Sequence, residues 1–360
     1  MFFDIIHFHT MFSPEKPSQS VFPDSTLQQL SNFKTAREKL TTTDFHFKSM
    51  LKLLMLGLLT LIPDLVENSG VLIDNKHLKT IAGLLSYQIS LNDLLDFQHS
   101  GRDDIGEVIA TASAKEQLAY QHLLELLNQT CKPEQIKLVQ NCIAEIITIE
   151  TWAAAKRDWS IQDAIEYRNL VNAVSNVLVT TVTLKFPQQI VDKLESDSEH
   201  PSIEGIRAKY DWILTNQYDN RLERTILIMH NLAMAGQIDD DRFGVEIDSV
   251  LNIHSVALVA KEYFQDDSKV EQELNRLKTQ YLSAARQLGL SPIAVTGIDF
   301  AQGQLMQRSM AWLTHSRVSH IPVWKRLMQR RAQTGKWPFQ LGDNHTSVGL
   351  RERLYVAGEI

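Results

Sequence analysis

Glycine, proline and cysteine are all scarce in this sequence, and each shortage excludes a class of architecture. The 360 residues include 15 glycines and 10 prolines, few for a turn-rich all-β chain. No stretch shows the apolar–polar alternation of several successive strands. The two cysteines, Cys131 and Cys142, form no disulfide framework, which favours a reducing compartment. The sequence therefore predicts neither a turn-rich β fold nor a disulfide-rich secreted domain.

Excess positive charge and long hydrophobic runs are also missing. The net charge is −7, so the chain as a whole has no basic surface suited to nucleic acid. The longest apolar run, Leu53–Ile62, is about half of the ~20 residues that cross a bilayer, so we expect no stable membrane insertion. The N-terminus, MFFDIIHFHTMFSPEK, lacks the basic and apolar regions of a signal peptide. A cytoplasmic protein is expected.

What the sequence does contain is helical periodicity in an apolar background. Hydrophobic residues make up 44% of the chain, enough for one large core. We expect an irregular arm over 1–24, one all-α bundle over 25–335, and an irregular tail over 336–360. The polar stretch 187–202 is expected to be a loop. The expected helices cover 27–40, 44–67 with a break near Pro63, 77–97, 103–128, 133–157, 160–186, 203–235 with a break near Asp219, 249–265, 267–288 and 300–332.

One of these helices contains a segment that favours strand by propensity. Residues 177–184, VLVTTVTL, are rich in β-branched side chains. A helix is nevertheless expected there, because an apolar face of helix length prevails over propensity when the helix is central.

The main acidic cluster lies in 232–248, LAMAGQIDDDRFGVEID. Asp240, Gly244 and Asp248 are four residues apart, so on a helix they share one face, with bare backbone at the middle position. Asp239 is expected to face away from the other acidic side chains. Adjacent carboxylates repel each other, and a divalent cation relieves the repulsion. Mg²⁺ fits such a site because it combines one or two carboxylates with water and substrate phosphate oxygens.

A second cluster, Asn92, Asp93 and Asp96, precedes the first by 144 residues, measured from Asp96 to Asp240. Its i, i+3 and i, i+4 spacings allow all three side chains to point in one direction. In a helical bundle, two such helices can face each other across a central cavity and bring their carboxylates to one mouth. The alternative is that both clusters are solvated acidic ends of helices.

The two clusters together resemble the paired metal motifs of class I isoprenoid synthases, which include trans-prenyltransferases and terpene synthases. The segment 92–96, NDLLD, resembles DDxxD, and 232–244 is similar to the prenyltransferase run LGxAFQIxDDxLD. The same stretch resembles the terpene-synthase pattern NDxxSxxxE, with Gly244 at the Ser position. The resemblance extends over about 45–320 and implies an all-α bundle with a central apolar cavity. The Mg²⁺ ligands that it implies are Asn92, Asp93, Asp96, Asp240, Asp241, Gly244 and Asp248.

The resemblance also implies arginines that bind diphosphate. Arg102 lies where prenyltransferases have the second Arg of the pair after DDxxD. Arg317 lies in MAWLTHSRV, which resembles the C-terminal terpene-synthase stretch that ends in Arg-Tyr. Arg168 is the arginine nearest to the position of the diphosphate-sensing Arg in terpene synthases.

Departures from the family pattern favour the terpene-synthase side. The GKxxRP motif of prenyltransferases is missing, and Val174–Ser175 replaces their Lys-Thr pair, so a site for isopentenyl diphosphate is not expected. The expected function is ionisation of a prenyl diphosphate, in which Mg²⁺ stabilises the leaving diphosphate and apolar walls exclude water. Prenyl transfer to another acceptor and a non-catalytic helical binding protein remain alternatives. A homodimer is left open.

Overall fold

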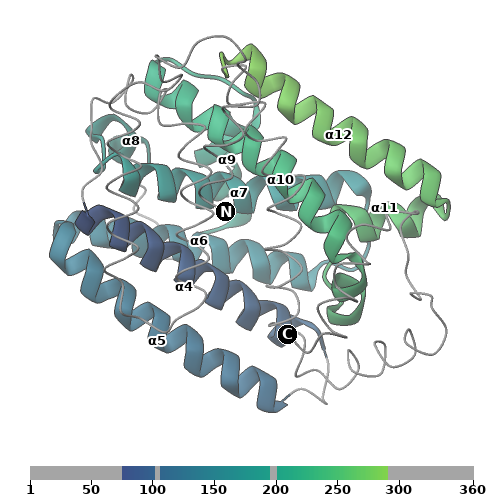
Figure 1. Cartoon of the computed structure of the whole chain (residues 1–360), viewed down its shortest axis with the longest axis horizontal. Coiled ribbons are helices and arrows are strands. Elements are labelled where there is room, and N and C mark those ends of the chain that lie inside the picture. Colours follow the sequence, from purple (N-terminus) through teal and green to yellow (C-terminus); the bar gives the residue numbers. More distant parts are fainter. Residues whose placement is uncertain (1–74, 102–105, 195–200, 291–360) are drawn as a thin grey trace, which may run out of the picture.

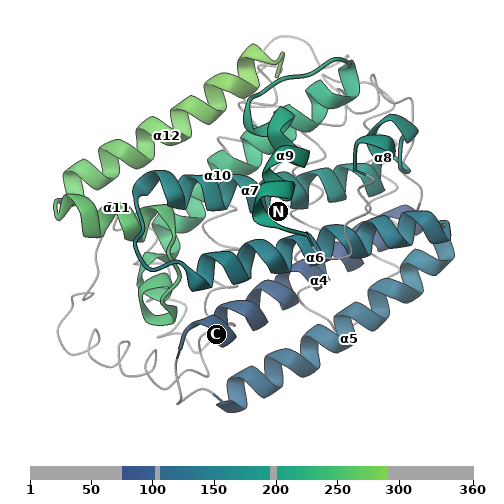
Figure 2. The same ribbon diagram turned by 180° about the vertical axis from the view of Figure 1, so that it is seen from behind.

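Every regular element that the structure describes is a helix (Figures 1 and 2). The computed structural model describes residues 75–101, 106–194 and 201–290. These ranges contain nine helices and no strand, which confirms the all-α class. The expected N-terminal arm, the expected helices before residue 75, the expected helix over 300–332 and the expected C-terminal tail lie outside the described residues. The helices are α4 (Asn75–His99), α5 (Gly106–Thr130), α6 (Pro133–Ala155), α7 (Ile161–Thr183), α8 (Gln188–Leu194), α9 (Ile203–Leu214), α10 (Arg221–Leu251), α11 (Val256–Phe264) and α12 (Asp267–Gln287).

Helix α7 is the central element of the described bundle. It contacts α4, α6, α9, α10 and α11, whereas α5 packs along α4 and α12 packs along α10 (Figure 1). The β-branched segment 177–184 is helical as far as Thr183 and almost entirely buried, which confirms the prediction of a helix. Burial on several sides stabilises this helix by more than its low propensity destabilises it.

Local capping groups fix several helix starts. The Ser160 hydroxyl accepts a hydrogen bond from the Asp163 N–H at 3.1 Å, and the Asp163 carboxylate accepts one from the Ser160 N–H at 2.9 Å. This capping box starts α7 close to the predicted position. Ser255 caps α11 in a similar way, through a contact of 3.4 Å with the Leu258 N–H.

Two sequence predictions are wrong in detail. The expected helix over 249–265 is broken, because α10 ends at Leu251 and Asn252 adopts the left-handed conformation with φ of 57°. The expected loop at 187–202 contains the short helix α8, whose apolar residues Ile190, Val191 and Leu194 are buried against the core. In the second case tertiary burial orders a segment whose polar composition suggested a loop.

No helix within the described ranges is both long enough and apolar enough to cross a bilayer. Cys131 and Cys142 are both free thiols. Burial raises the pKa of the Cys142 thiol to about 12, and this side chain behaves as part of the core.

Candidate functional site

The first acidic cluster occupies the last two turns of α4. The Asn92 side-chain amide donates a hydrogen bond of 2.8 Å to an oxygen of Asp96, so these two residues share one face of the helix, as their spacing predicts. Asp96 is 7% exposed, and Asn92 and Asp93 are half-buried. A carboxylate near the C-terminus of a helix interacts unfavourably with the helix dipole, and Asp96 does so while mostly buried.

The second cluster occupies the C-terminal half of α10, and its side chains diverge. A Cβ atom on Gly244 would lie 3.6 Å from both carboxylate oxygens of Asp248, so the Asp248 side chain extends over the bare backbone of Gly244. This confirms that the two residues share a face. Asp239 points to α12, where it pairs with Lys278 at 2.6 Å and with Arg242 of its own helix at 3.2 Å. Asp239 therefore does face away from the rest of the cluster.

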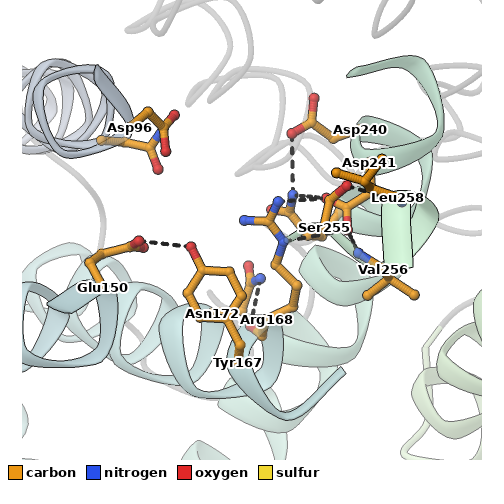
Figure 3. Close-up of polar contacts among 12 residues, drawn as sticks. Asp96, Glu150, Tyr167, Arg168, Asn172, Asp240, Asp241, Ser255, Val256 and Leu258 are labelled. Atoms are coloured by element: carbon orange, nitrogen blue, oxygen red, sulfur yellow. Dashed lines mark hydrogen bonds and ion pairs between the residues drawn. The ribbon is translucent and has the colours of Figure 1, made fainter. Parts of the chain in front are cut away.

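Asp241 joins three helices. One of its oxygens contacts Arg168 Nη2 at 2.9 Å and accepts a hydrogen bond of 2.8 Å from Gln237. The other accepts from the Val256 N–H at 2.8 Å and lies 3.4 Å from Arg168 Nε. The α10 carboxylate thus binds α7 and the N-terminus of α11 (Figure 3). Burying Asp241 and Arg168 together is favourable only because each supplies the other's counter-charge.

Electrostatics around Arg168 reflect this concentration of carboxylates. Burial favours the neutral guanidine, but Asp241, Tyr167, Asp248 and Asp240 together raise the pKa of Arg168 above its usual value. Burial, the charge of Asp241 and that of Asp240 raise the pKa of Asp248, whereas Arg168 and a hydrogen bond with Ser255 lower it. The net effect is a raised pKa for Asp248, so an added cation would stabilise its ionised form.

Glu150 is a buried acid that sequence analysis did not identify as a site residue. It lies on α6, is 6% exposed, and its Oε2 accepts a hydrogen bond of 2.8 Å from the Tyr167 hydroxyl. Burial is the largest cause that raises the pKa of Glu150 to about 7, and the charge of Asp96 adds to it. Tyr167 and Arg168 act in the opposite direction. The only sequence feature that could have identified Glu150 is its position as the single acidic residue in the apolar run 146–154.

A small cavity adjoins Glu150 and Asp96. Its volume is about 40 Å³, and its walls come from the ends of α4, α6 and α10 and from the start of α7. At ~10–15 Å³ for each water molecule, it has room for about three. It is much smaller than the ~300–1,000 Å³ of most small-molecule sites. The polar and aromatic side chains that line it include Asp96, His99, Glu150, Trp159, Tyr167 and His254.

Trp159 is the centre of the aromatic wall of this cavity. The His254 ring stacks on it with a centroid distance of 5.0 Å and an interplanar angle of 18°. The Trp152 and Tyr167 rings approach it at 6.1 Å and 5.9 Å. Trp159 and Tyr167 both pack in the core and line the cavity, so they combine the two roles at this position.

The two acidic clusters lie on either side of the same two residues of α7. The charge of Asp96 acts on Tyr167, whereas the charges of Asp240, Asp241 and Asp248 act on the adjacent Arg168. Figure 3 shows this arrangement, with Asp96 on one side and Asp240 on the other. Helix α7 therefore brings together side chains that are far apart in the sequence.

The described carboxylates suit a cation that brings additional ligands with it. Across 75–101, 106–194 and 201–290, no three acidic, histidine or cysteine side chains are grouped as a ready-made metal site. Asp240 and Asp248 fit the mode in which Mg²⁺ takes one or two carboxylates and completes its shell with water and phosphate oxygens. Asp241 is already engaged by Arg168 and Val256, so its expected role as a ligand competes with these contacts. Arg102 and Arg317 lie outside the described residues.

Comparison with known proteins adds no assignment: no protein-family model, no curated protein and no solved structure matches this chain.

Proposed function

We propose that the chain is a class I isoprenoid-synthase-like enzyme that ionises a prenyl diphosphate with the help of Mg²⁺ and forms a terpene product. The observation that supports this proposal is the placement of the two acidic clusters on either side of Tyr167 and Arg168. When bound, Mg²⁺ supplies positive charge to the leaving diphosphate. The hydrocarbon chain would lie in a separate apolar cavity of the bundle. The cavity beside Glu150 is too small to hold that chain.

The protein's own groups have distinct roles in this proposal. Asp240 and Asp248 on α10, and Asp96 on α4, would hold Mg²⁺. Arg168 contacts Asp241 through Nε and Nη2, so we assign its Nη1 to a diphosphate oxygen. Asp241 acts mainly by positioning Arg168 and by anchoring α11 through the Val256 N–H.

The test is incubation of the full chain with Mg²⁺ and geranyl, farnesyl or geranylgeranyl diphosphate. Release of diphosphate together with a hydrocarbon or an alcohol is the expected result. Release only when an acceptor is added would support prenyl transfer instead, and no release with any substrate would refute the proposal in favour of a non-catalytic helical protein.

Two variants probe the metal assignment. Asp96→Ala and Asp240→Ala should each abolish turnover while the far-ultraviolet circular dichroism stays unchanged, because alanine favours the helix and neither carboxylate takes part in its backbone hydrogen bonds. Asp211→Ala, which removes an exposed carboxylate on α9, is the matched control and should keep full activity. Full activity in either of the first two variants would refute their assignment as ligands.

A further inference from the structure

The lining of the cavity beside Glu150 includes buried polar groups, where a terpene-forming site is expected to be dry. Two mostly buried carboxyl groups, Asp96 and Glu150, and the Tyr167 hydroxyl contribute to its lining. We propose that this cavity holds a nucleophilic water whose proton Glu150 accepts, so that the product is a prenyl alcohol. The inference rests on the proposed function and changes its expected outcome, because the sequence predicted walls that exclude water.

The size and polarity of the cavity suit water. A volume of about 40 Å³ admits about three water molecules and no group as large as an isoprene unit. A buried water needs two to four polar partners, and Asp96, Glu150 and Tyr167 supply them from three different helices.

Glu150 is held in a fixed orientation for this role. The Tyr167 hydroxyl donates to Oε2 at 2.8 Å, which leaves Oε1 as the oxygen that we assign to the water. The two side chains come from adjacent helices, α6 and α7, both within the core. A base held by a second group keeps its geometry during proton transfer, and Tyr167 is therefore a positioning residue.

The location of the cavity places the water beside the proposed ionisation site. Asp96 lines the cavity and also belongs to the first acidic cluster. Tyr167 lines it as well, and the next residue, Arg168, faces the second cluster at Asp241. In Figure 3, Glu150 and Tyr167 lie on the Asp96 side of Arg168. The water and the leaving diphosphate are thus assigned to neighbouring sides of one segment of α7.

The proposed step balances in atoms and charge. The C–O bond to diphosphate breaks, and its electron pair leaves with the diphosphate oxygen. The water oxygen then forms a C–O bond with the allylic cation while one water proton moves to the Glu150 carboxylate. The products are a prenyl alcohol, diphosphate and a protonated Glu150, which returns its proton to solvent through the open side of the cavity before the next turnover.

The test is turnover in H₂¹⁸O, with diphosphate release and the products measured separately. The wild-type protein should release diphosphate and form an alcohol that carries one ¹⁸O atom. Glu150→Gln should lower the alcohol at least tenfold relative to diphosphate released, with a shift to hydrocarbon. Tyr167→Phe should lower it less, and Glu125→Gln, an exposed carboxyl change on α5, should leave the ratio unchanged.

Three outcomes separate this inference from the proposed function. No diphosphate release by the wild-type protein refutes the proposed function itself. Diphosphate release with only hydrocarbon, or with alcohol free of ¹⁸O, leaves the proposed function standing and overturns the water inference. An unchanged alcohol fraction in folded Glu150→Gln overturns the role of Glu150, and if that variant does not fold, the labelled wild-type product and Tyr167→Phe decide the question.

A second measurement requires neither substrate nor metal. A high-resolution crystal structure of the full chain should show ordered water within hydrogen-bond distance of Glu150 Oε1. A cavity filled by a side chain, or one without such water, would overturn the inference.

Discussion

Glu150 makes the stability of this protein depend on pH in a way that one substitution should remove. In the folded chain the pKa of Glu150 rises from 4.5 to about 7, chiefly because burial disfavours the carboxylate. A raised pKa means that the folded state binds the proton more tightly than the unfolded state does. This contribution to stability is therefore fully present below pH 4.5 and is lost as the pH rises to about 7.

The size of the effect follows from the shift. At ~1.4 kcal/mol for each pKa unit, a rise from 4.5 to about 7 corresponds to about 3.5 kcal/mol of unfolding free energy. Glu150→Gln keeps the shape of the side chain and a group that accepts the Tyr167 hydrogen bond, but it does not titrate. The difference in unfolding free energy between wild type and Glu150→Gln should therefore change by about 3 kcal/mol between pH 4.5 and 7.5.

Urea denaturation of both full-length proteins, followed by circular dichroism at half-unit pH intervals, measures this difference. His230 acts in the opposite direction, because burial lowers its pKa from 6.5 to about 4 and destabilises the folded chain as the pH falls below 6.5. Its contribution is common to both proteins and cancels in the difference. Glu125→Gln on the exposed face of α5 is the control and should run parallel to wild type. Curves for wild type and Glu150→Gln that stay parallel across this range would refute the buried-acid account.

Three further substitutions test other parts of the bundle. Asp241→Asn removes the counter-charge of buried Arg168 and should cost about 3–5 kcal/mol of unfolding free energy in urea, whereas a loss below 1 kcal/mol would show that the pair is not buried in solution. Gly244→Ser adds a Cβ in ordinary contact with its neighbours, so it should stabilise the chain by about 0.5 kcal/mol and raise Mg²⁺ affinity by calorimetry; weaker binding would contradict the shared face. Lys209→Met should destabilise the folded chain by about 3–5 kcal/mol because it leaves the buried Glu145 carboxylate without its counter-charge. Adding Glu145→Leu should recover most of this loss, and no recovery would show that the two residues are not coupled.

Helix content and helix faces were predictable because they depend on residues three or four apart. The i, i+4 spacing correctly placed Asn92 with Asp96 and Asp248 over Gly244, and it required no knowledge of the rest of the chain. The start of α7 followed from Ser160 and Asp163, which form the local capping box. These interactions are complete within a single helix or its first turn, so the sequence contains all their determinants.

Which carboxylate meets which partner depended on the tertiary structure. Asp239, Asp240 and Asp241 are adjacent in the sequence, but rotation of ~100° per residue sends them toward different neighbours. Asp239 reaches Lys278 on α12, whereas Asp241 reaches Arg168 on α7. The choice depends on where α7 and α12 pack, and no local pattern in α10 contains that information.

Glu145 and Glu150, both on α6, also show which features the sequence predicts and which depend on the tertiary structure. Each is a single acidic residue in an apolar stretch of α6, and the sequence does not distinguish them. In the folded chain Glu145 pairs with Lys209 at 2.6 Å, whereas Glu150 accepts a hydrogen bond from Tyr167 and lines a small cavity. The sequence alone determined that these residues lie on a helix. Only the tertiary structure decided which becomes an ion pair and which a buried acid with a raised pKa, because desolvation and charge pairing depend on side chains brought from distant parts of the chain.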